Sequence, residues 1–209
     1  RRACSWESGR GSSGSSREVV PEVVRDRDGH DHHLRELAAR EPVDLLQRYA
    51  GLNPCWAVVT GERGVAAALC RGLAKRGFHV LILASDEVRG SVLAQDLRTQ
   101  YGVESAFIAC DVAQIGQSDE VAKRLLRVIS QATGGGDIGV LVAAGGGDDL
   151  AMHFSDVTLA QNRKRANLNV LGTLGLAHAF LPRFVGRPCR SAFITRTGKS
   201  FAPPSSSLS

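Results

Sequence analysis

The chain is notable first for what it lacks. Its 209 residues contain no run of about 18 or more apolar residues, so we expect no transmembrane segment. Its five cysteines are far apart and none forms a CxxC pair, which argues against a disulfide framework and against a structural zinc site. A reducing compartment is the simplest interpretation of that pattern.

The charge of the chain is also unremarkable. The formal net charge is +5, and its one basic cluster is Arg163-Lys164-Arg165. A cluster of this size could contact nucleic acid or an anionic membrane, but we interpret it as the solvated face of a helix. No nucleic acid is therefore expected as a partner. The length and the 43% hydrophobic content fit one folded domain with its own core.

The first 30 residues are rich in Arg, Ser and Gly and begin at Arg1 without a methionine. Such a segment buries too little apolar surface to offset its ordering entropy, so we interpret residues 1–30 as a flexible extension. Its composition resembles the mature side of an organellar transit peptide. We therefore expect a mitochondrial location, with the cytoplasm as the alternative.

Residues 31–54 form the expected helical lead-in, with Asp31 as N-cap and an interruption near Pro42. The histidines close to Asp31 could form a metal site, but we interpret them as the polar start of this helix, so no metal is expected. From residue 55 onward, the sequence alternates short apolar runs with helical periods.

This alternation is typical of a parallel sheet with helices on both faces, that is, a doubly wound, Rossmann-like α/β domain over residues 55–209. Right-handed crossovers predict the strand order 3-2-1-4-5. The expected strands are 58–59, 80–83, 106–110, 138–142 and 192–195, and the expected helices are 64–76, 88–101, 118–132 and 159–181.

The first turn of this pattern could bind a nucleotide. Thr60-Gly61 follows the first strand and Gly64 opens the next helix. Glycines here let the backbone approach a pyrophosphate, which then lies at the helix N-terminus. A tight strand-to-helix turn without a ligand requires the same glycines, so the loop alone leaves both interpretations open.

Several segments together resemble the short-chain dehydrogenase/reductase family. They are 56–60, Leu73-Ala74-Lys75-Arg76-Gly77, Cys110-Asp111-Val112, 138–142 and Asn169-Val170-Leu171-Gly172. Residues 44–49 are similar to the branch of 17β-hydroxysteroid dehydrogenases and very-long-chain 3-oxoacyl-CoA reductases. The resemblance covers residues 44–209 in order. It implies a nicotinamide-dependent fold that is degenerate and C-terminally truncated here.

The resemblance implies NADP as the cofactor, held by an altered loop. Thr60, Gly61 and Gly64 match the family's T-G-x-x-x-G-x-G, but one loop residue is missing and Ala66 replaces the last glycine. Arg63 matches a position where a basic residue often meets the 2′-phosphate of NADP.

Two further positions belong to the implied cofactor set. Asp111 matches the residue near the adenine, and Gly145 is the one matching residue of the N-N-A-G motif, which reads Ala143-Ala144-Gly145-Gly146 here. Ser85 stands where NADP-preferring relatives commonly have arginine. The implied cofactor site is therefore partly preserved and partly eroded.

The implied catalytic set of Asn, Ser, Tyr and Lys is not intact. Asn169 is the only matching position. Arg196 aligns best with the serine, and an arginine cannot replace a hydroxyl that orients a carbonyl. The tyrosine would fall near Ser209, yet no tyrosine occurs after Tyr101.

These departures predict a pseudoenzyme: a non-catalytic accessory or structural subunit of a larger assembly, with other protein subunits as partners. The last strand would otherwise leave an open edge and an apolar face uncovered. Two alternatives remain. The chain could be a fragment of an NADP(H)-dependent carbonyl reductase for ketosteroids or 3-oxoacyl thioesters, or it could be a dinucleotide-sensing regulator.

Overall fold

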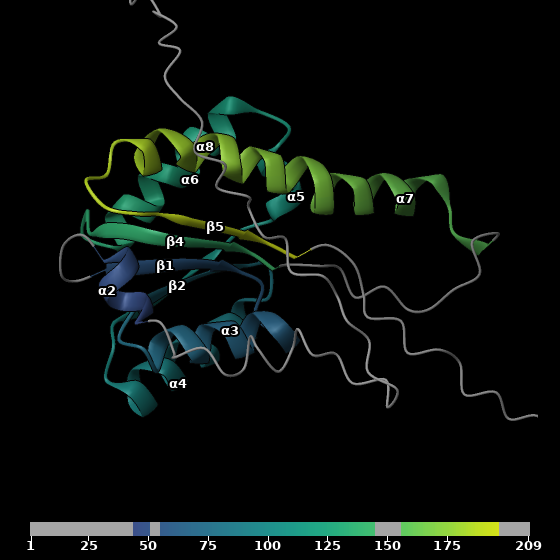
Figure 1. Cartoon of the computed structure of the whole chain (residues 1–209). Helices are drawn as coiled ribbons and strands as arrows, with labels where there is room; N and C mark the ends of the chain where they lie inside the picture. Colours follow the sequence, from purple (N-terminus) through teal and green to yellow (C-terminus); the bar gives the residue numbers. More distant parts are fainter. Residues whose placement is uncertain (1–43, 51–54, 145–155, 197–209) are drawn as a thin grey trace, which may run out of the picture. The chain divides into compact units, whose positions relative to one another are not determined.

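Five parallel strands form the centre of the part of the chain that the structure describes. The structure is a computed structural model, and it describes residues 44–50, 55–144 and 156–196. The strands are β1 (Cys55–Thr60), β2 (His79–Ala84), β3 (Ser105–Ala109), β4 (Asp137–Ala143) and β5 (Ala192–Thr195). Their order is β3-β2-β1-β4-β5, as Figure 1 shows. The predicted doubly wound fold is therefore confirmed.

The central strands are apolar on both sides because both faces of the sheet are covered. Successive residues of a strand point to opposite faces. In β1, Ala57 and Val59 pack into one buried cluster, whereas Trp56 and Val58 pack into the other. A sheet of this kind requires helices on each side, and the sequence between the strands supplies them.

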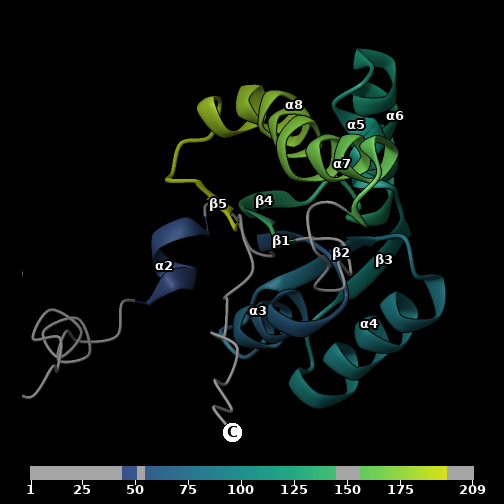
Figure 2. The ribbon, with the colours of Figure 1, turned by 90° about the vertical axis from the view of Figure 1, so that its right-hand side faces the viewer.

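Helices cover the two faces in separate groups (Figures 1 and 2). The first group comprises α3 (Gly64–Ala74) and α4 (Glu87–Tyr101). The second comprises α5 (Val112–Ile115), α6 (Asp119–Ala132) and α8 (Thr173–Val185). Local signals fix the bounds of the longer helices: Asp86 caps α4, Ser118 caps α6, and Gly102 ends α4 with a φ of 67°.

The final helix is longer and less regular than the sequence predicted. The expected helix 159–181 consists of α7 (Leu159–Ala166), a π-helical segment η2 (Asn167–Gly172) and α8, which continues through Pro182. By length and hydropathy alone, this 27-residue stretch could cross a membrane, contrary to the expectation of no such segment. A helix that packs on a sheet can pass the same test, and α8 buries Leu176 and Phe180 in the core.

The short helix α5 was not predicted, since four residues are too few for a helical period to appear in the sequence. It crosses η2 and the start of α8 at very close range. A Cβ on Gly172 would lie 2.5 Å from the Val112 carbonyl oxygen, and one on Gly175 would lie 2.7 Å from the Gly116 nitrogen. The glycines of this segment are therefore required by backbone contact.

The described part of the lead-in is α2 (Leu45–Tyr49), with Asp44 as its N-cap. It belongs to the same compact unit as the sheet, residues 43–209, and Leu45, Leu46 and Tyr49 pack against one buried cluster. The start predicted at Asp31, the nearby histidines and the extension 1–30 lie outside the described residues.

A buried arginine connects α2 to the sheet. Arg187, which follows α8, forms a bidentate ion pair with Asp137 at the start of β4, with distances of 2.8 Å from Nε and 2.7 Å from Nη2. Its Nη2 also donates a hydrogen bond to the Tyr49 carbonyl oxygen at 2.6 Å. The side chain is only 7% exposed. Burial lowers the pKa of Arg187, but hydrogen bonding and charge from Asp137 outweigh it and leave that pKa raised.

Candidate functional site

The candidate site lies where the carboxyl ends of the parallel strands meet. Hydrogen bonds join these ends laterally: the Gly61 N–H donates to the Leu83 carbonyl oxygen at 2.8 Å, and the Ala144 N–H donates to Thr60 Oγ1 at 3.0 Å. The second bond bridges β1 and β4, the neighbours at which the strand order reverses. In open α/β sheets, this switch point is where ligands bind. Thr60 thus lies at this switch point.

The loop between β1 and α3 turns at two glycines. Gly61 and Gly64 both have positive φ, 94° and 54°, which side-chain-bearing residues rarely adopt. Beyond its chain neighbours and its own helix, no heavy atom of the described residues would lie within 4 Å of a Cβ on Gly64, so its conformation, and not its surroundings, requires glycine. Ala66 is buried between α3 and the sheet, so the core accommodates the methyl group that replaces a family glycine.

The loop carries a carboxylate, which is unfavourable beside a phosphate. The Glu62 side chain is only 10% exposed, and its Oε1 accepts a hydrogen bond from Arg63 Nε at 3.2 Å. The predicted contact for a 2′-phosphate is therefore already paired with a carboxylate. Sequence reasoning did not single out Glu62, although an acidic residue inside a loop expected to hold phosphates was a readable signal.

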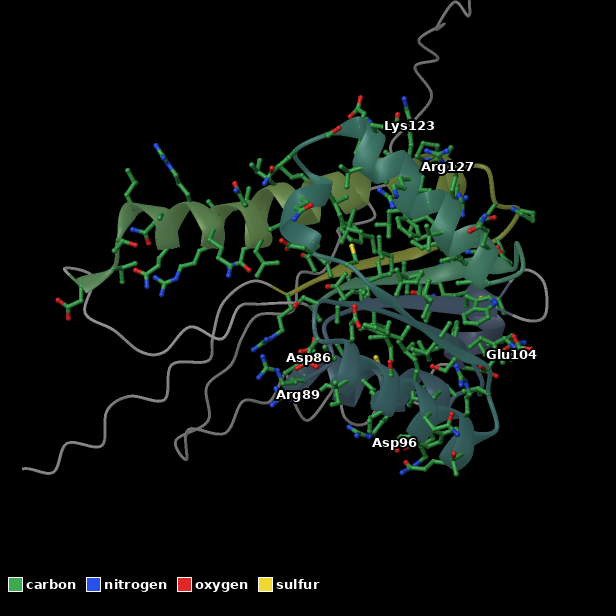
Figure 3. The ribbon with its side chains drawn as sticks, turned by 180° about the vertical axis from the view of Figure 1, so that it is seen from behind. Asp86, Arg89, Asp96, Glu104, Lys123 and Arg127 are labelled. Atoms are coloured by element: carbon green, nitrogen blue, oxygen red, sulfur yellow. The ribbon has the colours of Figure 1, made fainter. Side chains whose placement is uncertain are left out.

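The end of β2 repeats this pairing. Asp86 caps α4 by accepting a hydrogen bond from the Arg89 N–H at 3.0 Å, and Arg89 Nε lies 3.6 Å from Asp86 Oδ2. Figure 3 shows the two side chains together at this edge, with Glu104 at the opposite end of the sheet. Sequence reasoning missed Arg89, which lies about one helical turn after Ser85. The resemblance implies an arginine at the position of Ser85 in NADP-preferring relatives. Arg89 too has its own carboxylate.

Asp111 lies on the same edge, immediately after β3. It caps α5 by accepting a hydrogen bond from the Ala113 N–H at 3.0 Å, and its side chain is exposed. The neighbouring Cys110 N–H donates to the Ala84 carbonyl oxygen at 2.9 Å. Burial, and then the charge of Asp111, raises the pKa of the Cys110 thiol to about 11, which keeps it protonated near neutrality.

The remaining predicted positions fall in three places. Asn169 lies half-buried in η2, and π-helical turns are frequent at functional sites. The Arg196 N–H donates to the Ala143 carbonyl oxygen at 3.0 Å, which places this exposed residue beside the end of β4. Gly145 lies outside the described residues. The loop residues Thr60 to Gly64 thus gather at one edge, with Asp111 farther along it.

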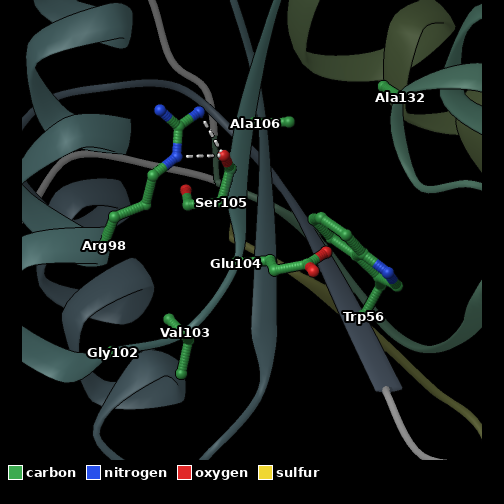
Figure 4. Close-up of a pocket in the computed structure, with 8 residues that line it drawn as sticks. All are labelled: Trp56, Arg98, Gly102, Val103, Glu104, Ser105, Ala106 and Ala132. Atoms are coloured by element: carbon green, nitrogen blue, oxygen red, sulfur yellow. Dashed lines mark hydrogen bonds between the residues drawn. The ribbon is translucent and has the colours of Figure 1, made fainter.

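An open hollow of about 500 Å³ lies near the opposite end of the strands, at the turn before β3 (Figure 4). Its lining includes Trp56, Arg98, Glu104 and Ser105. Arg98 donates from Nε to the Ser105 carbonyl oxygen at 2.8 Å, so its guanidinium is hydrogen-bonded to the backbone of β3. The Trp56 indole nitrogen is buried, and its N–H has no hydrogen-bond partner among the described residues. The described residues that line this hollow do not form an acid–base or nucleophilic set.

Residues 55–192 match the family described as short chain dehydrogenase. The chain belongs to that family. Among curated relatives, the very-long-chain 3-oxoacyl-CoA reductase of Laccaria bicolor is 29% identical over 148 residues, covering 70% of this chain and 42% of the relative. The human inactive hydroxysteroid dehydrogenase-like protein 1 is 26% identical over 179 residues, covering 85% and 50%. The chain therefore spans about half the length of these relatives or less.

Solved structures agree on the fold. A metagenomic short-chain oxidoreductase in complex with NADP superposes with a TM-score of 0.61 at 23% identity, covering 72% of this chain and 65% of that one. The L-sorbose reductase from Gluconobacter frateurii, complexed with NADPH and L-sorbose, gives 0.56 at 26% identity, covering 70% and 53%. Those proteins hold NADP(H). In this chain, the positive-φ glycines of the first loop are compatible with a dinucleotide phosphate, whereas the Glu62 carboxylate would repel one.

Proposed function

We propose that this protein is a non-catalytic member of the short-chain dehydrogenase family that acts as an accessory or structural subunit of a larger assembly. The observation that carries the proposal is Arg196. The resemblance aligns it with a substrate-orienting serine, and its backbone N–H donates to the Ala143 carbonyl oxygen at the end of β4. A guanidinium is permanently charged and accepts no hydrogen bond, so it cannot serve as that hydroxyl.

A second support is an apolar stripe on the last helix. Val170, Leu174, Leu181 and Val185 are spaced by four and seven residues and are all exposed. Such spacing places side chains on one helix face. Phe193 and Ile194 of β5, at one edge of the described sheet, are exposed as well. Exposed apolar surface of this extent marks protein contacts, and we assign it to a partner subunit.

The names of the relatives are consistent with this proposal and with its alternative. One relative is named inactive, and others are named reductases. The alternative is that the chain is part of an NADP(H)-dependent carbonyl reductase acting on ketosteroids or 3-oxoacyl thioesters. Asn169 in its π-helical turn favours this alternative. The location stays a proposal from composition, with the mitochondrion first and the cytoplasm second.

Native mass spectrometry of the protein from its own source tests the proposal. We expect a particle far heavier than the 22.3 kDa chain, containing other polypeptides. A homo-oligomer that consumes NADPH with a 3-oxoacyl-CoA or a ketosteroid would establish the reductase instead.

Matched variants locate the contact. Leu174→Glu adds a charge to the apolar stripe, and Val88→Glu adds the same charge to another exposed apolar site, on α4 across the sheet. We expect Leu174→Glu to release the protein from the particle and Val88→Glu to leave it bound. Equal retention of the two variants would remove the stripe as the contact surface.

A further inference from the structure

Glu62 occupies an unusual place for an acidic residue. It lies between the two positive-φ glycines Gly61 and Gly64, in the loop where the resemblance implies nucleotide phosphates. Its side chain is only 10% exposed, whereas that of the next residue, Arg63, is 48% exposed. The helix α3 begins at Gly64, two residues after Glu62. A carboxylate held there has a fixed position relative to the turn.

Among the described residues, Arg63 is the ion-pair partner of Glu62. The two groups are adjacent in sequence, so the pair forms at little conformational cost. A phosphate that binds Arg63 would therefore have to displace the carboxylate of Glu62, which stays close because the two residues are adjacent in the chain. It would also be repelled by that carboxylate, since like charges near a protein surface interact appreciably at short range.

The loop after the neighbouring strand gives no compensating cation. Arg89 is the basic residue there, and it lies 3.6 Å from the Asp86 carboxylate. β1 and β2 are paired along their length, so these two loops flank one region of the sheet edge. Arg63 and Arg89 therefore each have an acidic neighbour of their own.

We propose that Glu62 is an internal anion that takes the place of a nucleotide phosphate in this loop and makes the loop discriminate against NADP(H). The inference rests on the proposed function, because it treats the loop as the remnant of a nucleotide site in a non-catalytic subunit. Glu62 offsets the attraction of Arg63 for a 2′-phosphate, and it places a like charge beside a pyrophosphate. NADP(H) suffers both effects, and NAD(H) only the second.

The test is isothermal titration calorimetry of the full natural protein with NADPH and with NADH. Glu62→Gln keeps the size of the side chain and removes its charge. Glu87→Gln, an exposed acid in the first turn of α4, is the matched control for net charge. We expect Glu62→Gln to raise the affinity for NADPH about tenfold, which corresponds to about 1.4 kcal/mol, and to raise that for NADH less.

A second variant separates the two contributions. In the double variant Glu62→Gln with Arg63→Ala, we expect the preference for NADPH over NADH to disappear, because the released guanidinium is absent. Melting curves check that each variant is folded. The proposal is overturned if the unaltered protein already prefers NADPH, if Glu62→Gln gains no affinity, or if Glu87→Gln gains as much. None of these outcomes bears on the partner subunits, which are tested separately through the apolar stripe.

Discussion

Removal of the Arg187 guanidinium should destabilise the protein more than any surface substitution. The Arg187–Asp137 pair is bidentate, and its side chains are 7% and 15% exposed. Arg187→Met would leave the Asp137 charge largely buried without this partner, and breaking such a pair typically costs about 3–5 kcal/mol. The variant also loses the hydrogen bonds to Tyr49 and Ser191.

The expected loss is readily measurable. For a domain of this size, each kcal/mol lowers the melting temperature by about 2–4 °C, so Arg187→Met should melt roughly 6–20 °C lower. Circular dichroism during heating and during urea unfolding gives the two values. Arg183→Met, on the exposed side of α8, is the control and should change stability by about 0.5 kcal/mol or less.

A double-mutant cycle identifies the cause. If the ion pair is responsible, Arg187→Met combined with Asp137→Asn should cost less than the sum of the single variants, because neither charge of the pair then remains buried without the other. Equal melting of Arg187→Met and Arg183→Met would refute the reasoning, since the arginine would then stabilise neither α2 nor the start of β4.

Three further predictions follow from packing and burial. Gly175→Ala should destabilise the protein by about 1–3 kcal/mol, since its Cβ would lie 2.7 Å from the Gly116 nitrogen; urea unfolding measures this. By the same assay, Gly72→Ala should stabilise α3 by about 0.5–1 kcal/mol, because the added methyl meets only Arg76 Nη1 at 3.8 Å; any loss there would contradict the packing. Burial raises the pKa of Cys70 from 9.0 to about 12, so its contribution to stability is fully present below pH 9 and is lost as the pH rises toward 12. Cys70→Ala should flatten that alkaline decline in the free energy of unfolding, and an unchanged slope would exclude the thiol as its source.

The sequence predicted the fold well because its strongest signals are local. Apolar runs such as 80–83 and 138–142 lie inside β2 and β4, and capping residues such as Ser118 mark the starts of helices. Right-handed crossovers then allow few strand orders, and the predicted one is observed. The sequence missed α5 and the π-helical segment, since neither leaves a periodic signal of its own.

In the candidate site, too, some features could be predicted from the sequence and others could not. Gly61 and Gly64 could be recognised from sequence because positive φ angles favour glycine wherever the turn occurs. The pairing of Glu62 with Arg63 depends on which way two long side chains turn, and that is decided by the space around them. The sequence by itself determined a doubly wound sheet with an altered first loop. Only the tertiary structure decided that the Glu62 carboxylate lies nearly buried beside Arg63, and that Arg187 joins three segments far apart in the chain, because packing sets both.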